Sequence, residues 1–465
     1  MSEDKKRTEL GKMTTDSVWK LVFLLSVPTV LSMLISSVYN TADTFFVSKL
    51  GDSATGAVGI VFSLQSIIQA FGYGIGMGCG SLVSRSLGAD DREGANRYAS
   101  SAVAAAAAVG IVIGSIGLLA TDPMLRMFGS TETILPNARG YARYILIGAP
   151  IMCVSFTLNN ILRAEGHATF SMIGLTVGGL INMALDPFYI FTLGYGVKGA
   201  AMATVLSQFI SFTILLCFFL MQKSCITLSV RFISRKLSDY LLIIRTGIPT
   251  VFRQGLGSIA TTLLNIQAAA FGDPAIAAVS IASKVYMLLR SLLIGVGQGF
   301  QPVAGYNYGA KKYSRVKKAF LVATVIGSTI SSASALVILL FPTQVMEFFN
   351  PESQTTVDFG VRMLRFLGLS LPVLAYSTFV NQLYQSLGYV KGATFLASCR
   401  QGIFFIPLIL ILPRVIGETG IRITQAAADL LTFAVSVPFG VYFFRRLPRE
   451  DGAELHARAE LNKKN

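Results

Sequence analysis

Two carboxylic acids lie inside long apolar stretches in the first half of the chain. Asp43 is part of YNTADTFFVSKLG, and Asp186 is part of NMALDPFYIF. An ionisable group in an apolar environment is costly, so each acid is a candidate functional residue. A desolvated carboxyl that faces a second carboxyl favours its protonated form, because burial and like charge both oppose ionisation. The two acids therefore suit a proton carrier. The alternative is that either acid lies near a membrane interface or caps a helix.

The residues next to Asp186 strengthen the first interpretation. Asn182 lies four positions earlier, so on a helix its amide shares a face with Asp186 and can reach the carboxyl or its water. Pro187 has no backbone N–H, which weakens the helix locally and leaves a carbonyl oxygen free to join the site. We therefore predict a polar site in a pliable part of this helix.

Other reactive groups are few. His167 is in a short turn and His456 is near the C-terminus, and the five cysteines show no CxxC spacing. This pattern predicts no metal cluster, no cofactor site and no nucleophile–base pair, which disfavours an enzyme. Ionisable residues do occur in apolar stretches of the second half, namely Arg253, Lys284, Arg290, Arg400 and Asp429. Basic groups in such positions either extend to the membrane surface or line a cavity, and the sequence leaves their role open.

Composition identifies the environment of these acids. The 465 residues have a mean hydropathy of +0.61, are 53% hydrophobic and only 14% charged, which is typical of a membrane protein. Charge-free runs such as 98–121 and 319–341 are long enough to cross a bilayer. We expect an all-α membrane protein with about twelve transmembrane helices, at 18–48, 54–82, 95–120, 136–160, 168–192, 197–222, 240–268, 276–308, 316–341, 357–386, 391–413 and 420–444.

The basic residues predict an orientation in the membrane. Lys and Arg are concentrated in the two tails and in every second connection, which by the positive-inside rule places both termini in the cytoplasm. The formal net charge of +15 then reflects topology and contact with lipid headgroups. A nucleic-acid partner is not expected, because the charge is spread over separate loops and forms no single stripe.

The chain contains an internal repeat. Gly51 and Asp52 recur as Gly272 and Asp273, an offset of 221 residues, and many later positions recur at the same or a neighbouring offset. Two copies of six helices each would enter the membrane in the same orientation, as pseudo-symmetric lobes around a central cavity. We expect an N-terminal tail, two lobes joined by a linker, and a C-terminal tail, at 1–17, 18–222, 223–239, 240–444 and 445–465.

The stretch FGYGIGMGCGS contains glycine at alternate positions. No strand precedes it and no GxGxxG occurs, so a dinucleotide-binding loop is excluded. On a helix, Gly72, Gly76 and Gly80 share one face, while Gly74 and Gly78 share another, so neighbouring helices can approach closely on both sides. The alternative to tight packing alone is a helix that slides or bends during transport.

The motifs ADTFFVSKLG, LRAEGHA, NMALDP and GQGFQPVAGYNYGA, together with the two six-helix lobes, resemble the multidrug and toxic compound extrusion (MATE) family, and in particular its bacterial DinF-type branch. The resemblance covers nearly the whole chain. It implies a cation site in the N-terminal lobe, with Asp43 and Asp186 as its carboxyls. It also implies polar partners and a surrounding network for these carboxyls, formed by Asn182, Asn159, Tyr141 and Thr204.

The resemblance further implies what the protein does. It would be an antiporter of the bacterial cytoplasmic (inner) membrane, in which H⁺, or else Na⁺ bound at Asp43 and Asp186, drives organic cations outward by alternating access. Separately, nothing in the sequence requires more than a monomer. Membrane lipids would surround it, and no cofactor is implied. A flippase for lipid-linked saccharides, from the same superfamily, is the alternative, and a wide cationic cavity would favour it.

Overall fold

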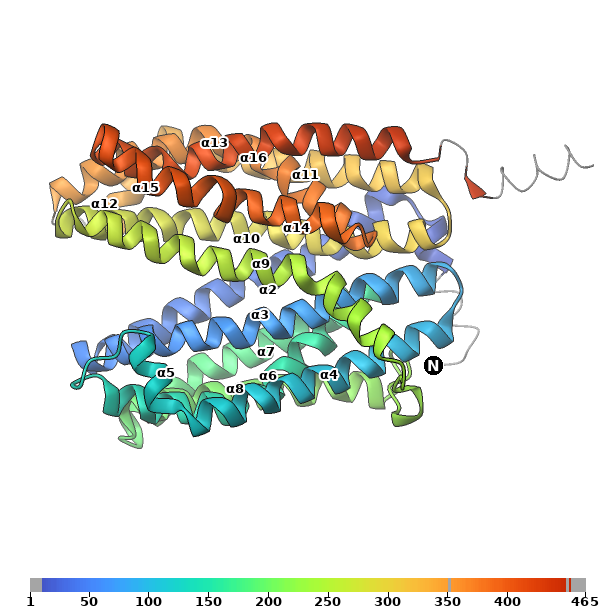
Figure 1. The fold of residues 1–465 in the computed structure, drawn as a ribbon, viewed down its shortest axis with the longest axis horizontal. Coiled ribbons are helices and arrows are strands. Elements are labelled where there is room, and N and C mark those ends of the chain that lie inside the picture. Colours follow the sequence, from blue (N-terminus) through green and yellow to red (C-terminus); the bar gives the residue numbers. More distant parts are fainter. Residues whose placement is uncertain (1–10, 350–352, 449–450, 453–465) are drawn as a thin grey trace, which may run out of the picture. The chain divides into compact units, whose positions relative to one another are not determined.

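The computed structural model describes residues 11–349, 353–448 and 451–452, and within these ranges it contains helices and no strand. The long helices of the first half are α2 (Val18–Ser48), α3 (Asp52–Gly88), α4 (Arg92–Leu119), α6 (Leu135–Ala164), α7 (Ala168–Pro187) and α8 (Gly196–Leu220). Those of the second half are α9 (Leu237–Ala269), α10 (Asp273–Gly309), α11 (Tyr313–Leu340), α13 (Gln354–Ser386), α14 (Val390–Ser398) continued by α15 (Phe405–Ile416), and α16 (Glu418–Arg446) (Figure 1).

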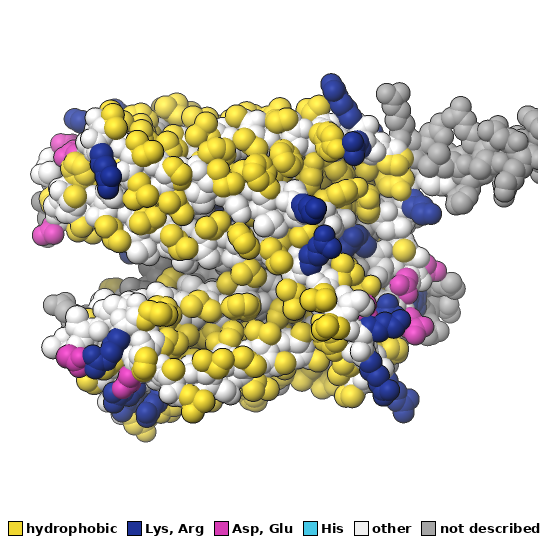
Figure 2. Space-filling model, in the orientation of Figure 1, with side chains coloured by type: hydrophobic (Ala, Val, Ile, Leu, Met, Phe, Trp, Pro, Cys, Tyr) yellow, Lys and Arg dark blue, Asp and Glu magenta, His cyan; other side chains and the backbone are white. Residues whose placement is uncertain are grey.

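Most of these helices can cross a membrane. Eleven are long and apolar enough among the described residues, and α9 is as long but carries Arg245 and Arg253. Figure 2 shows hydrophobic side chains over the middle of the helices, with Lys and Arg gathered near their ends. This pattern is typical of helices that span a bilayer. The expected all-α membrane fold is therefore confirmed.

Two short helices lie in connections between the expected membrane spans. They are α5 (Thr121–Met127) and α12 (Pro342–Phe349), which follow α4 and α11. Each has a proline in its first turn, Pro123 and Pro342, a position in which the missing N–H costs nothing. A search for membrane-length apolar runs passes over helices as short as these.

The internal repeat is visible in the helices themselves. The helices α3 and α10 each have 37 residues, and the helices that follow them, α4 and α11, each have 28. Gly51 and Gly272 precede α3 and α10 with φ angles of 101° and 89°, which favour glycine. The two halves of the sequence therefore fold in the same way.

The chain forms two compact units. One contains Leu31–Val251, and the other contains Ser17–Val30 together with the chain from Phe252 onward. The helices α2 and α9 therefore each contribute to both units. These units are defined by packing, whereas the lobes 18–222 and 240–444 are defined by the sequence repeat, so the limits of the lobes remain a prediction.

The glycines of α3 pack as the sequence predicts. A Cβ on Gly76 would lie 2.7 Å from the amide nitrogen of Asn160 on α6, and one on Gly78 would lie 2.2 Å from the carbonyl oxygen of Ile243 on α9. In the second unit, a Cβ on Gly299 of α10 would lie 2.5 Å from the backbone nitrogen of Ser26 on α2. Missing side chains thus let helices approach closely on two faces.

The segment after α8 is tied to the connection between α6 and α7. Glu165 is buried there, and its carboxylate accepts hydrogen bonds from the Ser224 hydroxyl at 2.8 Å and from the Cys225 N–H at 2.7 Å. Burial raises the pKa of Glu165, although these donors and nearby His167 act to lower it. The carboxylate of Glu165 therefore anchors the expected linker 223–239 to the first unit.

We expect Glu165→Ala to release this segment. Without the carboxylate, the Cys225 amide and the Ser224 hydroxyl lose the Glu165 acceptor, and the segment should exchange amide hydrogen faster by local opening. Hydrogen exchange of a peptide covering 223–228, measured by mass spectrometry, checks this. Glu165→Gln is the matched control, because its side-chain oxygen can still accept from both donors. Equal protection in wild type and Glu165→Ala would contradict the anchoring role.

Candidate functional site

The first candidate acid lies where α7 loses its regular geometry. Asp186 is fully buried and accepts a hydrogen bond from the Asn182 amide at 3.2 Å. Pro187 follows it, and the next residues form the π-helical turn η1 (Phe188–Thr192). Since proline supplies no N–H, the ladder of α7 is interrupted directly beside the carboxyl. Such π-helical turns occur often at functional sites.

The second acid comes from α2 and meets the first. Asp43 is half-buried, and its carboxyl lies close to that of Asp186. Asp43 Oδ1 and Asp186 Oδ2 are buried and have no hydrogen-bond partner among the described residues. Two adjacent carboxyls with unsatisfied oxygens can share a proton or hold a cation. The structure thus brings the two predicted acids together from sequence positions far apart.

The other predicted site residues lie at different distances from this pair. Tyr141 of α6 is buried, close to Thr204 and to both carboxyls. Asn159 instead donates through its amide to the Ser171 carbonyl of α7 at 2.9 Å. Its repeat partner Asn381 makes the same contact to α14, 2.7 Å from the carbonyl oxygen of Ala393. This shared bond joins helices, and a role of Asn159 in cation binding remains a prediction.

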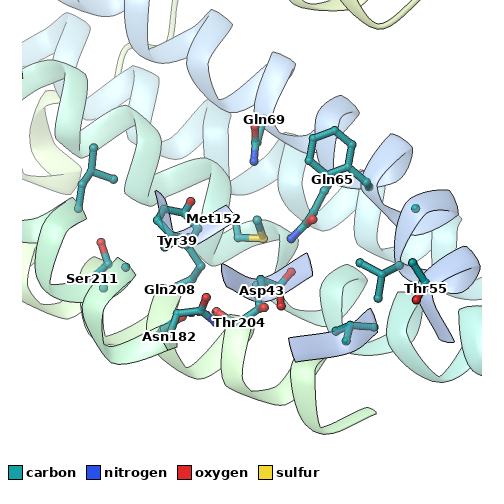
Figure 3. A pocket seen from close by; sticks show the side chains of 18 residues that line it. Tyr39, Asp43, Thr55, Gln65, Gln69, Met152, Asn182, Thr204, Gln208 and Ser211 are labelled. Carbon is teal, nitrogen blue, oxygen red and sulfur yellow. Dashed lines mark hydrogen bonds between the residues drawn. The ribbon is translucent and has the colours of Figure 1, made fainter. Parts of the chain in front are cut away.

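Asp43 faces a cavity of about 320 Å³ within the first unit. Figure 3 shows Asp43, Tyr39, Asn182 and Gln208 gathered on one side of it, with Gln65 and Gln69 projecting from α3. Asp43 is the one acid among the lining residues, and no Lys or Arg lines the cavity. The Gln208 side-chain oxygen is also buried without a partner among the described residues. The cavity therefore offers acceptors and negative charge to a ligand.

Sequence reasoning missed the glutamines of this cavity. Gln65 and Gln69 are four residues apart on α3 inside an apolar run, and Gln208 lies in a similar run on α8. Two glutamines four residues apart in a membrane helix could have indicated a polar site, because neutral amides in the membrane also need hydrogen-bond partners. The search for ionisable groups alone passed over them.

Asp429, the acid in an apolar stretch of the second half, forms hydrogen bonds with neighbouring side chains. Asp429 of α16 accepts from Arg400 Nε at 2.7 Å and from the Gln425 amide at 3.0 Å, and the Tyr286 hydroxyl also donates to it. Arg400 lies in the π-helical turn η3 (Cys399–Phe404) that joins α14 to α15. Asp429 therefore balances one arginine and is not a spare carboxyl.

Three residues of types that can bind a metal lie together at the connection between α6 and α7. The sequence spacing indicates no His/Cys/Asp/Glu cluster, yet Glu165, His167 and Cys225 lie together, with ligand atoms within 4.8 Å of one another. The sequence spacing does not show this group, because Cys225 comes from a segment far along the chain. Since the Glu165 carboxylate already accepts hydrogen bonds from this segment, the cluster is arranged to hold the chain in place.

Repeated six-helix halves with a buried polar site in a membrane-spanning bundle define a class, the polytopic helical transporters with parallel repeats. A family model described as MatE matches residues 28–188 and again 249–411, so the chain belongs to the MatE family of MATE transporters. The two matches fall on the two halves of the internal repeat. Members of this family are transporters, not enzymes.

Individual relatives cover nearly the whole chain. The multidrug export protein MepA of Staphylococcus saprophyticus is 25% identical over 453 residues, which is 97% of this chain and 99% of the relative. MepA of Staphylococcus aureus is 24% identical over 451 residues, with the same coverage of both chains. A structure of a multidrug resistance MATE family transporter in an outward-facing conformation superimposes with a TM-score of 0.89 at 28% identity, covering 94% of this chain and 98% of that one.

Proposed function

We propose that this protein exports organic cations across the bacterial cytoplasmic membrane in exchange for protons or sodium ions that bind at Asp43 and Asp186. The observation that carries the proposal is the pair of neighbouring carboxyls, one of which, Asp43, lines a cavity with no basic lining residue. The volume of about 320 Å³ lies within the range of roughly 300–1,000 Å³ that small-molecule sites occupy. The names of the MepA relatives support export of drugs.

Competition between the drug and the proton or sodium ion for the same carboxyls would couple drug export to ion entry. When an acid is ionised, the cavity attracts an organic cation, and Phe62, Tyr39 and Met152 offer it aromatic and polarisable surface. When a proton or sodium ion neutralises the acid, that attraction is lost and the drug is released. A site that holds one or the other, and opens alternately to each side, performs antiport. A membrane potential of about 100 mV supplies about 2.3 kcal/mol for each charge moved.

A flippase for lipid-linked saccharides is less well supported. It would need a wide cavity lined by basic residues. The wide cavity of the first unit has none, and the cavity of the second unit that is lined by arginines measures only about 40 Å³. That volume suits a small group and not a saccharide.

Transport into liposomes tests the proposal. Purified protein is reconstituted, and ethidium movement is followed with either a pH gradient or a sodium gradient imposed, against protein-free liposomes as the control. Movement driven by the pH gradient would support proton antiport. Movement driven only by sodium would keep the exporter and identify the ion. No movement above the control under either gradient would overturn the proposal.

A further inference from the structure

The second unit contains a cavity with the opposite charge to that of the first. It measures about 40 Å³ and is lined by Arg253, Arg290 and Arg400, with hydroxyl and amide side chains between them and no acid among the lining residues. All three arginines come from the central parts of α9, α10 and the α14–α15 segment, away from the helix ends. Arginine stays protonated in proteins, so this part of the membrane-spanning bundle is strongly positive.

One of the three arginines makes no direct contact with an acid among the described residues. Arg400 is paired with Asp429, whereas Arg290 makes no hydrogen bond or ion pair with any described residue. Arg253, which also lines the cavity, donates to the side-chain oxygen of Asn381 at 3.4 Å. The guanidinium groups also repel one another. A charge left without a partner inside a membrane protein is expensive, and such residues usually have a functional partner.

The internal repeat shows that the two cavities are equivalent places in the fold. At the offset of 221 residues, Gln69 is the partner of Arg290, and Gln208 is the partner of Asp429. Arg400 corresponds to Gly178 or Gly179, depending on which of the two offsets applies there. These first-half positions all line the cavity that contains Asp43. Repeat-related positions therefore surround both cavities, but the charged lining residue is Asp43 in the first cavity and arginine in the second.

We propose that the second unit binds a compact oxyanion, such as a phosphate group, between Arg253 and Arg290. Forked N–H donors match the oxygens of phosphate and carboxylate groups, and two arginines on different helices can approach one anion together. The volume of about 40 Å³ admits a single group of this kind and excludes a drug-sized molecule. The phosphate belongs either to a free anion or to the headgroup of an anionic lipid. This inference does not depend on the cation export proposed above.

The oxyanion proposal is tested by measuring ligand binding in the absence of drug and of any ion gradient. Wild-type protein in dodecyl maltoside micelles is titrated calorimetrically with inorganic phosphate at constant ionic strength. In a second arm, native mass spectrometry compares its adducts with phosphatidylglycerol and with uncharged diacylglycerol. Binding that depends on the arginines in the first arm identifies a free anion, and dependence only in the second arm identifies a lipid headgroup. Because no transport is measured, the result is separate from success or failure of the exporter proposal.

Substitutions of the arginines test whether the anion binds at this cavity. We expect Arg290→Gln and Arg253→Gln each to weaken binding about tenfold or more, and Arg290→Lys to restore part of it, since lysine keeps the charge but not the fork. Lys284→Gln is the matched control, because Lys284 is an exposed cation of the same helix that does not line the cavity. Without ligand, Arg290→Gln should unfold at the same temperature as wild type or higher. Binding in neither arm, or equal loss in Lys284→Gln, would overturn the inference.

Discussion

Asp186→Asn is expected to reduce gradient-driven ethidium export to the level of protein-free liposomes. The side chain keeps its shape, and its oxygen can still accept from the Asn182 amide, so the local fold of α7 should remain. An amide cannot take up a proton, and it offers no negative charge to a cation. Asp43→Asn should have the same effect, because the two carboxyls act as one site. The measurement is ethidium movement under the gradient that drives the wild type.

A matched control separates loss of function from loss of structure. Asp122→Asn removes an acid of the same unit that is partly exposed on α5 and paired with Arg139, so export should be close to that of the wild type. Thermal unfolding in detergent should give similar midpoints for all these variants. Full export by a folded Asp43→Asn or Asp186→Asn protein would refute the role of that residue.

Gly78→Ala is expected to destabilise the first unit strongly. The new Cβ would lie 2.2 Å from the carbonyl oxygen of Ile243 and 2.8 Å from the backbone nitrogen of Gly247. Both are backbone atoms of α9, so no side-chain rotation relieves the clash and the two helices must separate. Overpacking of this kind typically costs about 1–3 kcal/mol. The midpoint of thermal unfolding in detergent should fall.

The control for Gly78→Ala is a substitution at a glycine that has space for a Cβ atom. Gly257 of α9 has nothing within 4 Å of an added Cβ, so Gly257→Ala should leave stability unchanged or raise it by about 0.5–1 kcal/mol through helix propensity. Gly299→Ala, at the repeat partner of Gly78, should be as damaging as Gly78→Ala. If Gly78→Ala unfolded at the wild-type temperature, the close contact between α3 and α9 would be wrong.

Features with a regular spacing could be predicted from the sequence. Apolar runs predicted the long helices, and the glycine spacing of α3 predicted its two packing faces. The contact between Asn182 and Asp186 followed from a separation of four residues on one helix. All of these depend on neighbours along one helix, where geometry is fixed by 3.6 residues per turn.

Features that depend on distant segments were not accessible in the same way. The meeting of Glu165 with Cys225 joins two connections, and nothing in either one indicates the other. The positive cavity arises because three arginines on different helices point to one place, whereas the sequence shows only that each lies in an apolar run. The short helices α5 and α12 lack the length that an apolar-run search requires.

The division of α2 between the two units has a consequence for biosynthesis. Ser26 and Thr29 donate hydrogen bonds to the carbonyls of Val296 and Gly295, so residues 17–30 leave the ribosome long before the helix they pack on exists. The first unit, in turn, is completed only when residues 243–251 of α9 have been made. A nascent chain that stops between the two repeats would lack α9 and would leave the Gly74 and Gly78 face of α3 open to lipid. The ancestral duplication therefore no longer corresponds to two independently assembling halves.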